Sequence, residues 1–246
     1  MIIAIISDVH ANLEALQTVL EDVRRQGAER LWCLGDVVGY GADPNPVCDR
    51  IAAQADLAIA GNHDWAAVGK MKIGYFNSAA AVAIDWTAEQ LSDPSREWLA
   101  ALPLLRIEGE ARLVHATPSD PAGWQYVLSS PDAEAELESY QETLCFIGHS
   151  HFPAVYESDG TGLRYLQDER VPLVAGRRYL VNVAASASPA TATRGPPICC
   201  TTPRAGSWSG DGWSTTSTGP RRRSWTPGSP TSWPSVCSAG GDGGSD

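Results

Sequence analysis

Residues 1–10 read Met-Ile-Ile-Ala-Ile-Ile-Ser-Asp-Val-His, and this stretch decides the fold. Residues 2–6 form an unbroken apolar run rich in β-branched side chains, which is typical of a strand buried on both faces. Polar Ser7, Asp8 and His10 follow at once. The pattern predicts a central strand that carries potential ligands at its carboxyl end.

The same arrangement recurs along the next fifty residues. An apolar stripe with steps of three and four residues predicts an amphipathic helix from Leu13 to about Gly27. A second short strand at residues 31–34 ends at Gly35-Asp36, and a third at 57–60 ends at Gly61-Asn62. A helix over residues 46–55 is expected between them. Alternating strands and helices predict parallel pairing with right-handed crossovers.

The second half of the chain is predicted to be mostly β. Helices are expected first, at residues 76–91, 92–101 and 131–142. Short strand-like runs lie at residues 112–115, 144–148, 153–157, 162–166, 171–174 and 178–183. The sequence up to residue 183 therefore predicts a layered α/β domain.

All five histidines of the chain lie at the last residue of a strand-like run or just after one. They are His10, His63, His115, His149 and His151, and Asp8, Asp36, Asn62 and Asp64 occupy the same kind of position. Ligands of open α/β sheets bind beyond the carboxyl ends of the strands. One such histidine would be an ordinary hydrogen-bonded residue, but five together indicate a metal site.

The donor types favour catalysis over a closed structural site. Carboxylate, imidazole and amide donors without thiolate suit Mn²⁺, Fe or Zn²⁺ in a catalytic centre. Two such ions about 3.5–4 Å apart can clamp a phosphoryl group and lower the pKa of a water between them.

Five motifs stand in the order found in the calcineurin-like metallophosphoesterases, and the sequence resembles that superfamily over residues 1–183. The motifs are Asp8-Val9-His10, Gly35-Asp36, Gly61-Asn62-His63-Asp64, His115 and Gly148-His149-Ser150-His151. The closest resemblance is to the small bacterial and archaeal phosphoesterases. It implies a four-layer α/β/β/α sandwich and a hydrolase of phosphodiesters or phosphomonoesters.

The resemblance also implies a role for each site residue. Asp8, His10 and His151 would hold one divalent metal, Asn62, His115 and His149 the other, and Asp36 would bridge them. His63 would contact the substrate phosphate and protonate the leaving oxygen, oriented by Asp64. A metal-bridging hydroxide would attack phosphorus. The metals would be two Mn²⁺ ions, with Fe, Zn²⁺ or Ni²⁺ as alternatives.

Several alternatives stay open on the sequence. An arginine that protein phosphatases of the superfamily carry after the bridging aspartate is missing, since residues 37–41 read Val-Val-Gly-Tyr-Gly. A small phosphate ester is therefore expected as substrate. Trp124 and Tyr126 could stack on a base or an aromatic ester, or simply pack. A nucleotide pyrophosphohydrolase, a non-catalytic scaffold and an inactive product are the other readings.

Composition restricts the partners. The net charge of −11 argues against a nucleic-acid duplex held by a broad basic face. The apolar run at residues 2–6 is too short for a signal peptide or a membrane span. Six cysteines without a CxxC pair suggest free thiols in a reducing compartment, so a cytoplasmic location is expected. The oligomeric state does not follow from the sequence.

The composition changes abruptly after residue 183. Residues 184–246 contain no Leu, Glu, Lys, Phe, Tyr or His, and 39 of these 63 residues are Ser, Thr, Gly or Pro. Such a segment is predicted to be a disordered low-complexity tail. Restoring one base before codon 184 makes the following codons read GSVGQPRDRD, which resembles the family. We therefore infer a one-base frameshift, natural or a sequencing error, that removes the family's last strands and helix. A genuine linker, or a basic tail at Arg221-Arg222-Arg223 that binds an anion, are the alternatives.

Overall fold

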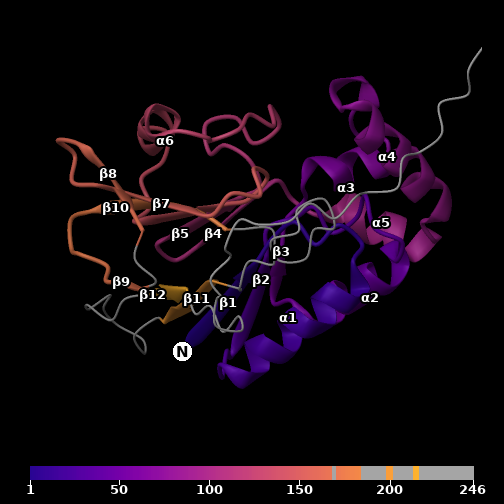
Figure 1. Cartoon of the computed structure of the whole chain (residues 1–246), viewed down its shortest axis with the longest axis horizontal. Coiled ribbons are helices and arrows are strands. Elements are labelled where there is room, and N and C mark those ends of the chain that lie inside the picture. Colours follow the sequence, from indigo (N-terminus) through magenta and orange to yellow (C-terminus); the bar gives the residue numbers. More distant parts are fainter. Residues whose placement is uncertain (168–169, 184–197, 202–212, 216–246) are drawn as a thin grey trace, which may run out of the picture.

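Two mixed β-sheets face each other in the computed structural model of the chain, with helices on both outer sides (Figure 1). The structure describes residues 1–167, 170–183, 198–201 and 213–215. The first sheet has the strand order β3-β2-β1-β11-β12-β9, and the second has the order β4-β5-β6-β10-β7-β8. The predicted four-layer α/β/β/α sandwich is confirmed.

The first sheet contains the three parallel strands that the sequence predicts. They are β1 (Ile2–Ile6), β2 (Arg30–Cys33) and β3 (Leu57–Ala58). Helices α1 (Leu13–Arg25) and α2 (Pro44–Gln54) are the crossovers. The side chain of Asn12 caps α1 by accepting from the main-chain N–H of Ala15 at 3.0 Å. The crossovers leave the carboxyl ends of the three strands at one edge.

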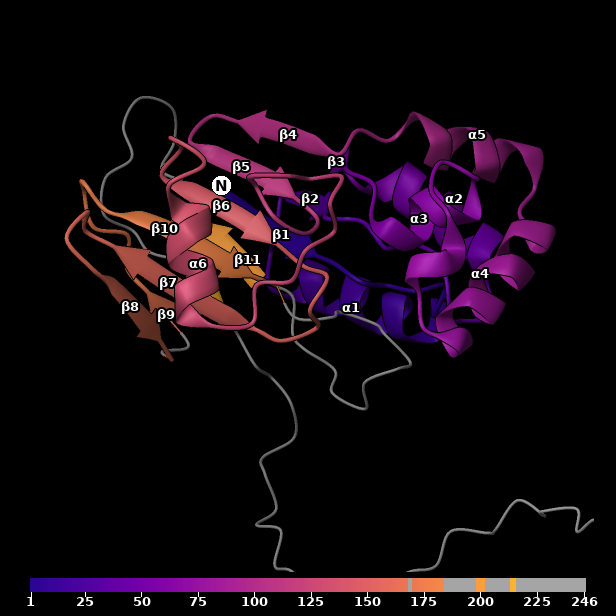
Figure 2. The same cartoon turned by 90° about the horizontal axis from the view of Figure 1, so that it is seen from above.

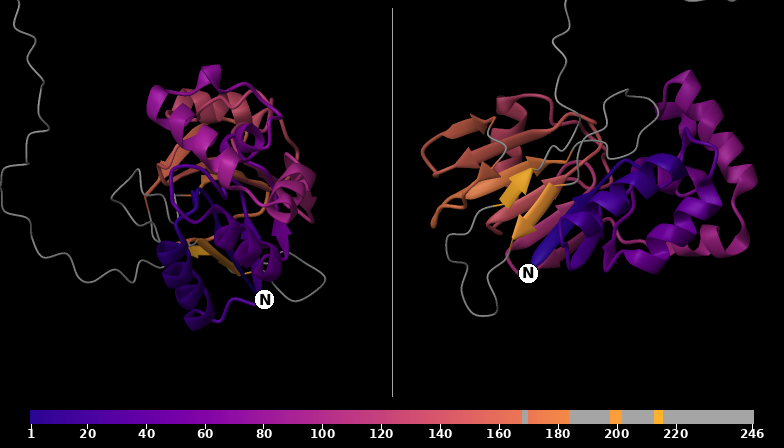
Figure 3. Two further views of the ribbon diagram at one scale, coloured as in Figure 1. Left: turned by 90° about the vertical axis from the view of Figure 1, so that its right-hand side faces the viewer. Right: turned by 60° about the horizontal axis from the view of Figure 1, so that its bottom comes forward.

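Three further helices lie beyond this edge, where they cover the end of the sandwich (Figure 3). They are α3 (Asn62–Ala67), α4 (Ser78–Gln90) and α5 (Asp93–Ala101), with a 3₁₀ turn at Ile73–Tyr75 before α4. Helix α3 begins at the residue pair Asn62-His63 itself. The first turn of α3 therefore holds Asn62 and His63, two of the predicted site residues, at this edge of the sheet.

The second sheet carries the remaining motifs. Its strands are β4 (Leu105–Glu108), β5 (Ala111–Val114), β6 (Leu144–Ile147), β7 (Ala154–Ser158), β8 (Leu163–Leu166) and β10 (Arg178–Asn182). Strands β5, β6 and β10 lie side by side and run parallel to one another, whereas β4 and β7 flank them antiparallel. Helix α6 (Ser130–Leu137) covers the outer face of this sheet (Figure 2).

Both faces of strand β1 are buried, which explains its unbroken apolar run. Ile3 and Ile5 point into the core between the two sheets, whereas Ala4 and Ile6 point into the core beneath α1 and α2. All four side chains are buried. Truncating Ile5 to alanine would cost about 2–5 kcal/mol of folding free energy, as is usual for a fully buried isoleucine.

The structure differs from the prediction for the tail in two short segments. Residues 198–201 form β11 (Ile198–Thr201), which pairs antiparallel with β1, and β12 (Trp213–Thr215) joins it to β9 (Arg170–Val171). One edge of β1 would otherwise present unpaired main-chain groups, so a strand of any suitable sequence is stabilised there. The rest of the predicted tail, 184–197, 202–212 and 216–246, lies outside the described residues.

Element boundaries differ elsewhere for identifiable reasons. Helix α6 was expected to reach residue 142 but ends at Leu137, where Arg178 donates to the carbonyls of Leu137 and Tyr140. Strand β4 and helix α3 were not expected, because β4 is an edge strand with exposed charges and α3 has six residues. Across the described ranges, no helix has the length and apolar character needed to cross a bilayer.

Candidate metal centre

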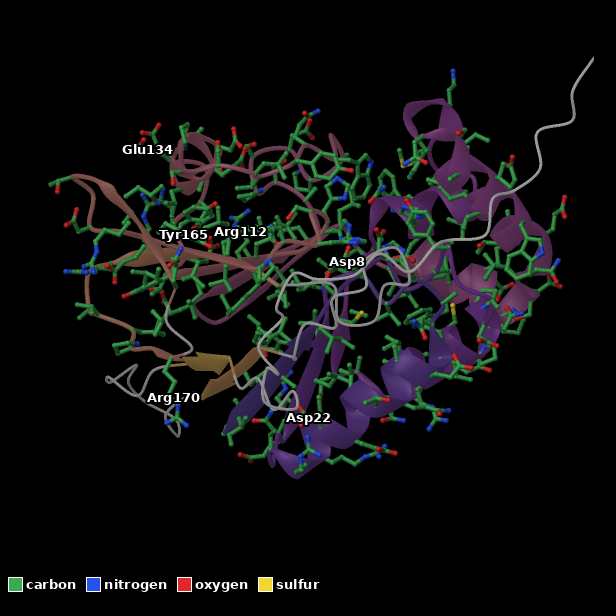
Figure 4. The ribbon with its side chains drawn as sticks, in the orientation of Figure 1. Asp8, Asp22, Arg112, Glu134, Tyr165 and Arg170 are labelled. Atoms are coloured by element: carbon green, nitrogen blue, oxygen red, sulfur yellow. The ribbon has the colours of Figure 1, made fainter. Side chains whose placement is uncertain are left out.

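The ends of five strands meet at the junction of the two sheets and the helices. Asp8 follows β1, Asp36 follows β2, Asn62 and His63 follow β3, His115 follows β5, and His149 and His151 follow β6. Figure 4 labels Asp8 at this junction, in the middle of the molecule. The side chains are buried, except that His151 is 15% exposed. Segments more than 140 residues apart in sequence, such as those of Asp8 and His151, therefore form one cluster, as expected.

The first group of potential ligands consists of Asp8, His10 and His151. The Nε2 atom of His151 lies 3.3 Å from Oδ1 of Asp8 and 3.1 Å from Nε2 of His10. Two imidazole nitrogens and a carboxylate oxygen that converge in this way can coordinate one cation.

The second group consists of Asp36, His115 and His149. The Nε2 atom of His115 lies 3.3 Å from Oδ2 of Asp36. The same Oδ2 atom lies 3.7 Å from Nε2 of His10, which belongs to the first group. One oxygen of Asp36 therefore faces both groups, which is the position that a bridging ligand requires.

Three histidines are oriented by main-chain carbonyl oxygens. The hydrogen bonds join Nδ1 of His10 to Val38 O (3.2 Å), Nδ1 of His115 to Leu34 O (2.8 Å) and Nε2 of His149 to Trp124 O (3.0 Å). Each bond uses one ring nitrogen as the donor and leaves the other nitrogen as an acceptor for a cation. The tautomers are thereby set for coordination.

The backbone at the site is strained. Five of the candidate ligands, which are not glycine, have left-handed φ angles between 50° and 67°: Asp8, His10, Asp36, His149 and His151. Such conformations cost free energy and cluster at functional sites. The ligand loops turn sharply directly after the strands, and this turn points their side chains back toward one centre.

Two glycines of the site allow close approaches that a side chain would block. A Cβ at Gly61 would lie 2.1 Å from Oδ1 of Asp36, and a Cβ at Gly39 would lie 2.4 Å from Nδ1 of His63. Gly39 also has a φ of +92°. Gly39 thus makes room for the His63 ring as part of a turn.

Two buried polar atoms without hydrogen-bond partners show that the residues around His115 fit a divalent cation. Within the described part of the chain, Oδ1 of Asn62 and Nε2 of His115 are buried and have no aligned hydrogen-bond partner. A buried polar atom without a partner costs roughly 1–3 kcal/mol. Both atoms are potential ligands, and a divalent cation would satisfy them. The set of carboxylate, imidazole and amide donors suits Mn²⁺, Fe or Zn²⁺.

The charges at the site also prepare it for cations. Burial alone would raise the pKa of Asp36, but the neighbouring His115 and His63 hold that pKa well below its usual range. Burial lowers the pKa of both His63 and His149 to about 4. At pH 7 Asp36 is therefore ionised, while the rings of His63 and His149 are neutral. The charged Asp36 and the neutral His149 are ready to bind a cation. Burial alone would lower the pKa of His115, but Asp36 raises it to about 9, so His115 has to release a proton when a metal binds.

Asp64 lies beside the site with other partners than expected. Its carboxylate accepts from the main-chain N–H groups of Val38 (3.0 Å) and Gly61 (2.9 Å). The Nδ1 atom of His63 is buried and has no hydrogen-bond partner among the described residues. The prediction that Asp64 orients the His63 ring is wrong for this structure, because Asp64 is in the first turn of α3 and reaches back to its start.

A cavity of about 870 Å³ opens beside the cluster. Besides the metal-binding side chains, it is lined by five aromatic residues: Tyr40, Trp65, Phe76, Trp124 and Tyr126. The rings of Tyr40 and Phe76 lie 4.7 Å and 5.1 Å from that of His63. Sequence reasoning singled out Trp124 and Tyr126 but missed Tyr40 and Phe76, which no local pattern marks.

Comparison with known proteins is consistent with this geometry. The calcineurin-like phosphoesterase superfamily domain matches residues 1–167. An uncharacterized protein of Methanocaldococcus jannaschii is 38% identical over 191 residues, which are 76% of each chain. The crystal structure of a metallophosphoesterase from Sphaerobacter thermophilus is 34% identical, with a TM-score of 0.68 over 81% of this chain and 82% of that one.

A more distant relative covers a smaller part. The symmetrical bis(5′-nucleosyl)-tetraphosphatase of Aromatoleum aromaticum is 32% identical over 95 residues, which are 36% of this chain and 34% of that enzyme. The match over residues 1–167, the 38% identity and the motifs assembled at the strand ends agree. The chain belongs to the calcineurin-like phosphoesterase superfamily.

Proposed function

We propose that the chain hydrolyses phosphodiesters or phosphomonoesters with the help of two divalent metal ions. The observation that carries the proposal is the position of Asp36, whose Oδ2 atom faces His10 at 3.7 Å and His115 at 3.3 Å. A carboxylate between two histidine-containing groups is suited to a metal pair, and paired metals serve phosphoryl transfer. The family membership supports the same reaction class.

Each ion would have its own set of ligands. Asp8, His10 and His151 would hold one, Asn62, His115 and His149 would hold the other, and Asp36 would contact both. Bound ions there would neutralise the phosphate charge and lower the pKa of a water molecule. Mn²⁺ is the preferred ion of this proposal, with Fe, Zn²⁺ or Ni²⁺ as alternatives.

His63 is proposed as the group that protonates the leaving oxygen. Its side chain lines the cavity, and its main-chain N–H donates to Asp36 Oδ1 at 2.9 Å, which fixes it beside the centre. Its pKa of about 4 rises when an anionic phosphate lies next to the ring. The ring then carries the proton that the departing oxygen needs.

A nucleotide pyrophosphohydrolase is the second candidate function. The similarity to a symmetrical bis(5′-nucleosyl)-tetraphosphatase, over 36% of this chain, favours it. A non-catalytic scaffold is less well supported, because a scaffold has no use for a buried, unsatisfied acceptor such as Asn62 Oδ1.

The substrate is proposed to be a small phosphate ester, and the compartment to be the cytoplasm. Cys33, Cys48 and Cys145 are buried free thiols, which suits a reducing environment.

Hydrolysis of bis-p-nitrophenyl phosphate beside p-nitrophenyl phosphate, with and without Mn²⁺, tests the proposal. We expect turnover that needs the metal and is lost with a chelator, and the ratio of the two rates gives the preference for diester or monoester. A folded, metal-loaded sample that hydrolyses neither these esters nor a dinucleoside polyphosphate would contradict both enzymatic proposals and favour the scaffold.

A further inference from the structure

We propose that Tyr126 is the stacking platform for the base of a nucleoside that is esterified to the substrate phosphate, so that the site selects phosphodiesters of a nucleoside. The inference rests on the proposed phosphodiesterase function and specifies its substrate class. It is carried by the contacts of segment 121–127, which borders the cavity.

One face of the Tyr126 ring is occupied and the rest is open. The ring stacks on His149 with centroids 4.1 Å apart and planes within 11°. Even so, 55% of the residue is exposed. A tyrosine that served only for packing would bury most of its surface, as Tyr140 and Tyr179 do at 1% and 0% exposure. Tyr126 is also one of the residues that line the cavity.

The platform has a fixed position relative to the metal centre. Two residues before it, the carbonyl oxygen of Trp124 accepts from Nε2 of His149 at 3.0 Å. Trp124 has a left-handed φ of 53°, and its ring lies edge-on to that of Trp65 at 5.5 Å. The same histidine is thus held by the carbonyl of Trp124 and the ring of Tyr126. A group stacked on Tyr126 would lie one ring away from a metal ligand.

The cavity has room for more than a phosphate. Its volume of about 870 Å³ is in the range of sites that enclose drug-sized ligands, about 300–1,000 Å³. A phosphate at the metal centre would leave most of that space for the groups esterified to it. The exposed side chain of Gln125 also lines the cavity; its Nε2 donates to Gly123 O at 3.2 Å, and its Oε1 can accept from the edge of a base.

The test uses two diesters that share the p-nitrophenolate leaving group. They are thymidine 5′-(p-nitrophenyl) phosphate and methyl p-nitrophenyl phosphate, so they differ in the group that stays on phosphorus. We expect kcat/KM to be about 10- to 100-fold higher for the thymidine ester, which is the range that stacking on an aromatic side chain provides. In Tyr126→Ala this preference should fall to near 1.

Matched variants separate stacking from folding. Tyr126→Phe keeps the ring and should keep the preference within about threefold, because base stacking needs the π face rather than the hydroxyl. Tyr165→Ala removes a tyrosine of similar exposure, 42%, from the distant strand β8 and should also keep it. Calorimetry of thymidine 5′-monophosphate against methyl phosphate gives an equilibrium readout, in which the nucleotide should bind at least 10-fold more tightly to the parent chain.

The outcomes distinguish this inference from the proposed function. Hydrolysis of both diesters without a preference would overturn the stacking platform and leave the phosphodiesterase in place. A preference that survives Tyr126→Ala would also overturn it. Hydrolysis of neither ester would contradict the phosphodiesterase, and equal binding of the two phosphates would then overturn the platform independently.

Discussion

The main-chain N–H of His63 donates to Oδ1 of Asp36 at 2.9 Å. This bond commits one oxygen of Asp36 to the start of helix α3 and leaves Oδ2 to face both His10 and His115. The residue proposed to bridge the metals and the residue proposed as the proton donor are therefore held in a fixed relation. A carboxylate is required at this position because both of its oxygens are used as acceptors.

The substitution Asp36→Asn should abolish the binding of both metal ions or lower the affinity for both together. The amide has no negative charge. Its NH₂ group must take the place of one carboxylate oxygen, where it faces either the main-chain N–H of His63 or a cation, and both contacts are repulsive. We expect bound metal, measured by mass spectrometry of the dialysed protein, to fall from two ions to fewer than one. Asp49→Asn makes the same chemical change at an exposed position of α2 and should retain both ions. Loss of one ion alone would show that Asp36 does not bridge.

The substitution His63→Asn should lower turnover while metal binding persists. The main-chain bond to Asp36 does not depend on the side chain, so the ligand geometry stays in place. Loss of a general acid typically lowers kcat by about 10²–10⁴-fold. The His63 ring also groups with His10 and Asp36 closely enough to share a cation. If metal content and kcat fall in parallel, His63 is a ligand and its assignment as an acid is wrong.

The strand pattern and the motifs were predictable from the sequence, because both depend on local periodicity. The unbroken run at residues 2–6 predicted a strand buried on both faces, and Ile5 and Ile6 do point into different cores. Convergence of histidines from β1, β3, β5 and β6 followed from the rule that ligands bind at the carboxyl ends of strands. These inferences need no knowledge of side-chain contacts.

The partners of Asp64 and the boundary of α6 could not be predicted in the same way. They depend on which of several nearby donors a side chain reaches once the chain is folded. Asp64 is adjacent to His63 in sequence but bonds to Val38 and Gly61, and the guanidinium of Arg178, about forty residues away, caps α6. The short strand β11 likewise owes its place to the open edge of β1.

The metal-free chain should be most stable slightly below about pH 6.5. On the acid side, the pKa values of His63 and His149 are about 4 in the fold against 6.5 for a free histidine. The unfolded chain therefore binds two more protons as the pH falls from 6.5 to 4, which lowers stability. Burial and Asp36 raise the pKa of Asp64 to about 7. The folded chain therefore keeps one proton on Asp64 that the unfolded chain has lost, and this partly offsets the loss of stability on the acid side.

On the alkaline side the sign reverses because of His115. Burial alone would lower its pKa, but Asp36 raises it to about 9. The folded chain then keeps a proton that the unfolded chain loses above pH 6.5, and this contribution to stability disappears as the pH rises to 9. Thermal melting of the chelator-treated chain from pH 4 to pH 9 should show the maximum, and His63→Asn should flatten its acid side. A melting temperature that rises steadily from pH 7 to pH 9 would contradict the assignment.

Asn182 should contribute to metal affinity without contacting the metal centre. It is buried at the end of β10, and its Nδ2 donates to Oγ of Ser150 at 2.8 Å. Ser150 separates His149 from His151, both of which have left-handed φ angles. Loss of a group that supports metal ligands typically costs about 10–100-fold in affinity.

A double-mutant cycle measures whether the two residues act through this bond. Asn182→Ala and Ser150→Ala should each weaken metal binding, determined by competition with a chelator, and the double variant should be no weaker than the worse single variant. Additive losses would mean that Asn182 and Ser150 act independently.

The segment after residue 183 should contribute to stability, and its restored reading frame should contribute more. A chain that ends at Val183 lacks β11 and leaves an edge of β1 unpaired, so we expect its melting temperature to be the lowest. Inserting one base before codon 184 restores the sequence that resembles the family, and this variant should melt highest. Each kcal/mol of added stability corresponds to about 2–4 °C in a domain of this size. Equal melting temperatures for the chain as given and the variant with the restored reading frame would contradict a stabilising role for the restored sequence.

Resequencing the gene tests the origin of the frameshift. If the reading frame of the chain as given is found again, a sequencing error is refuted and a natural frameshift is left.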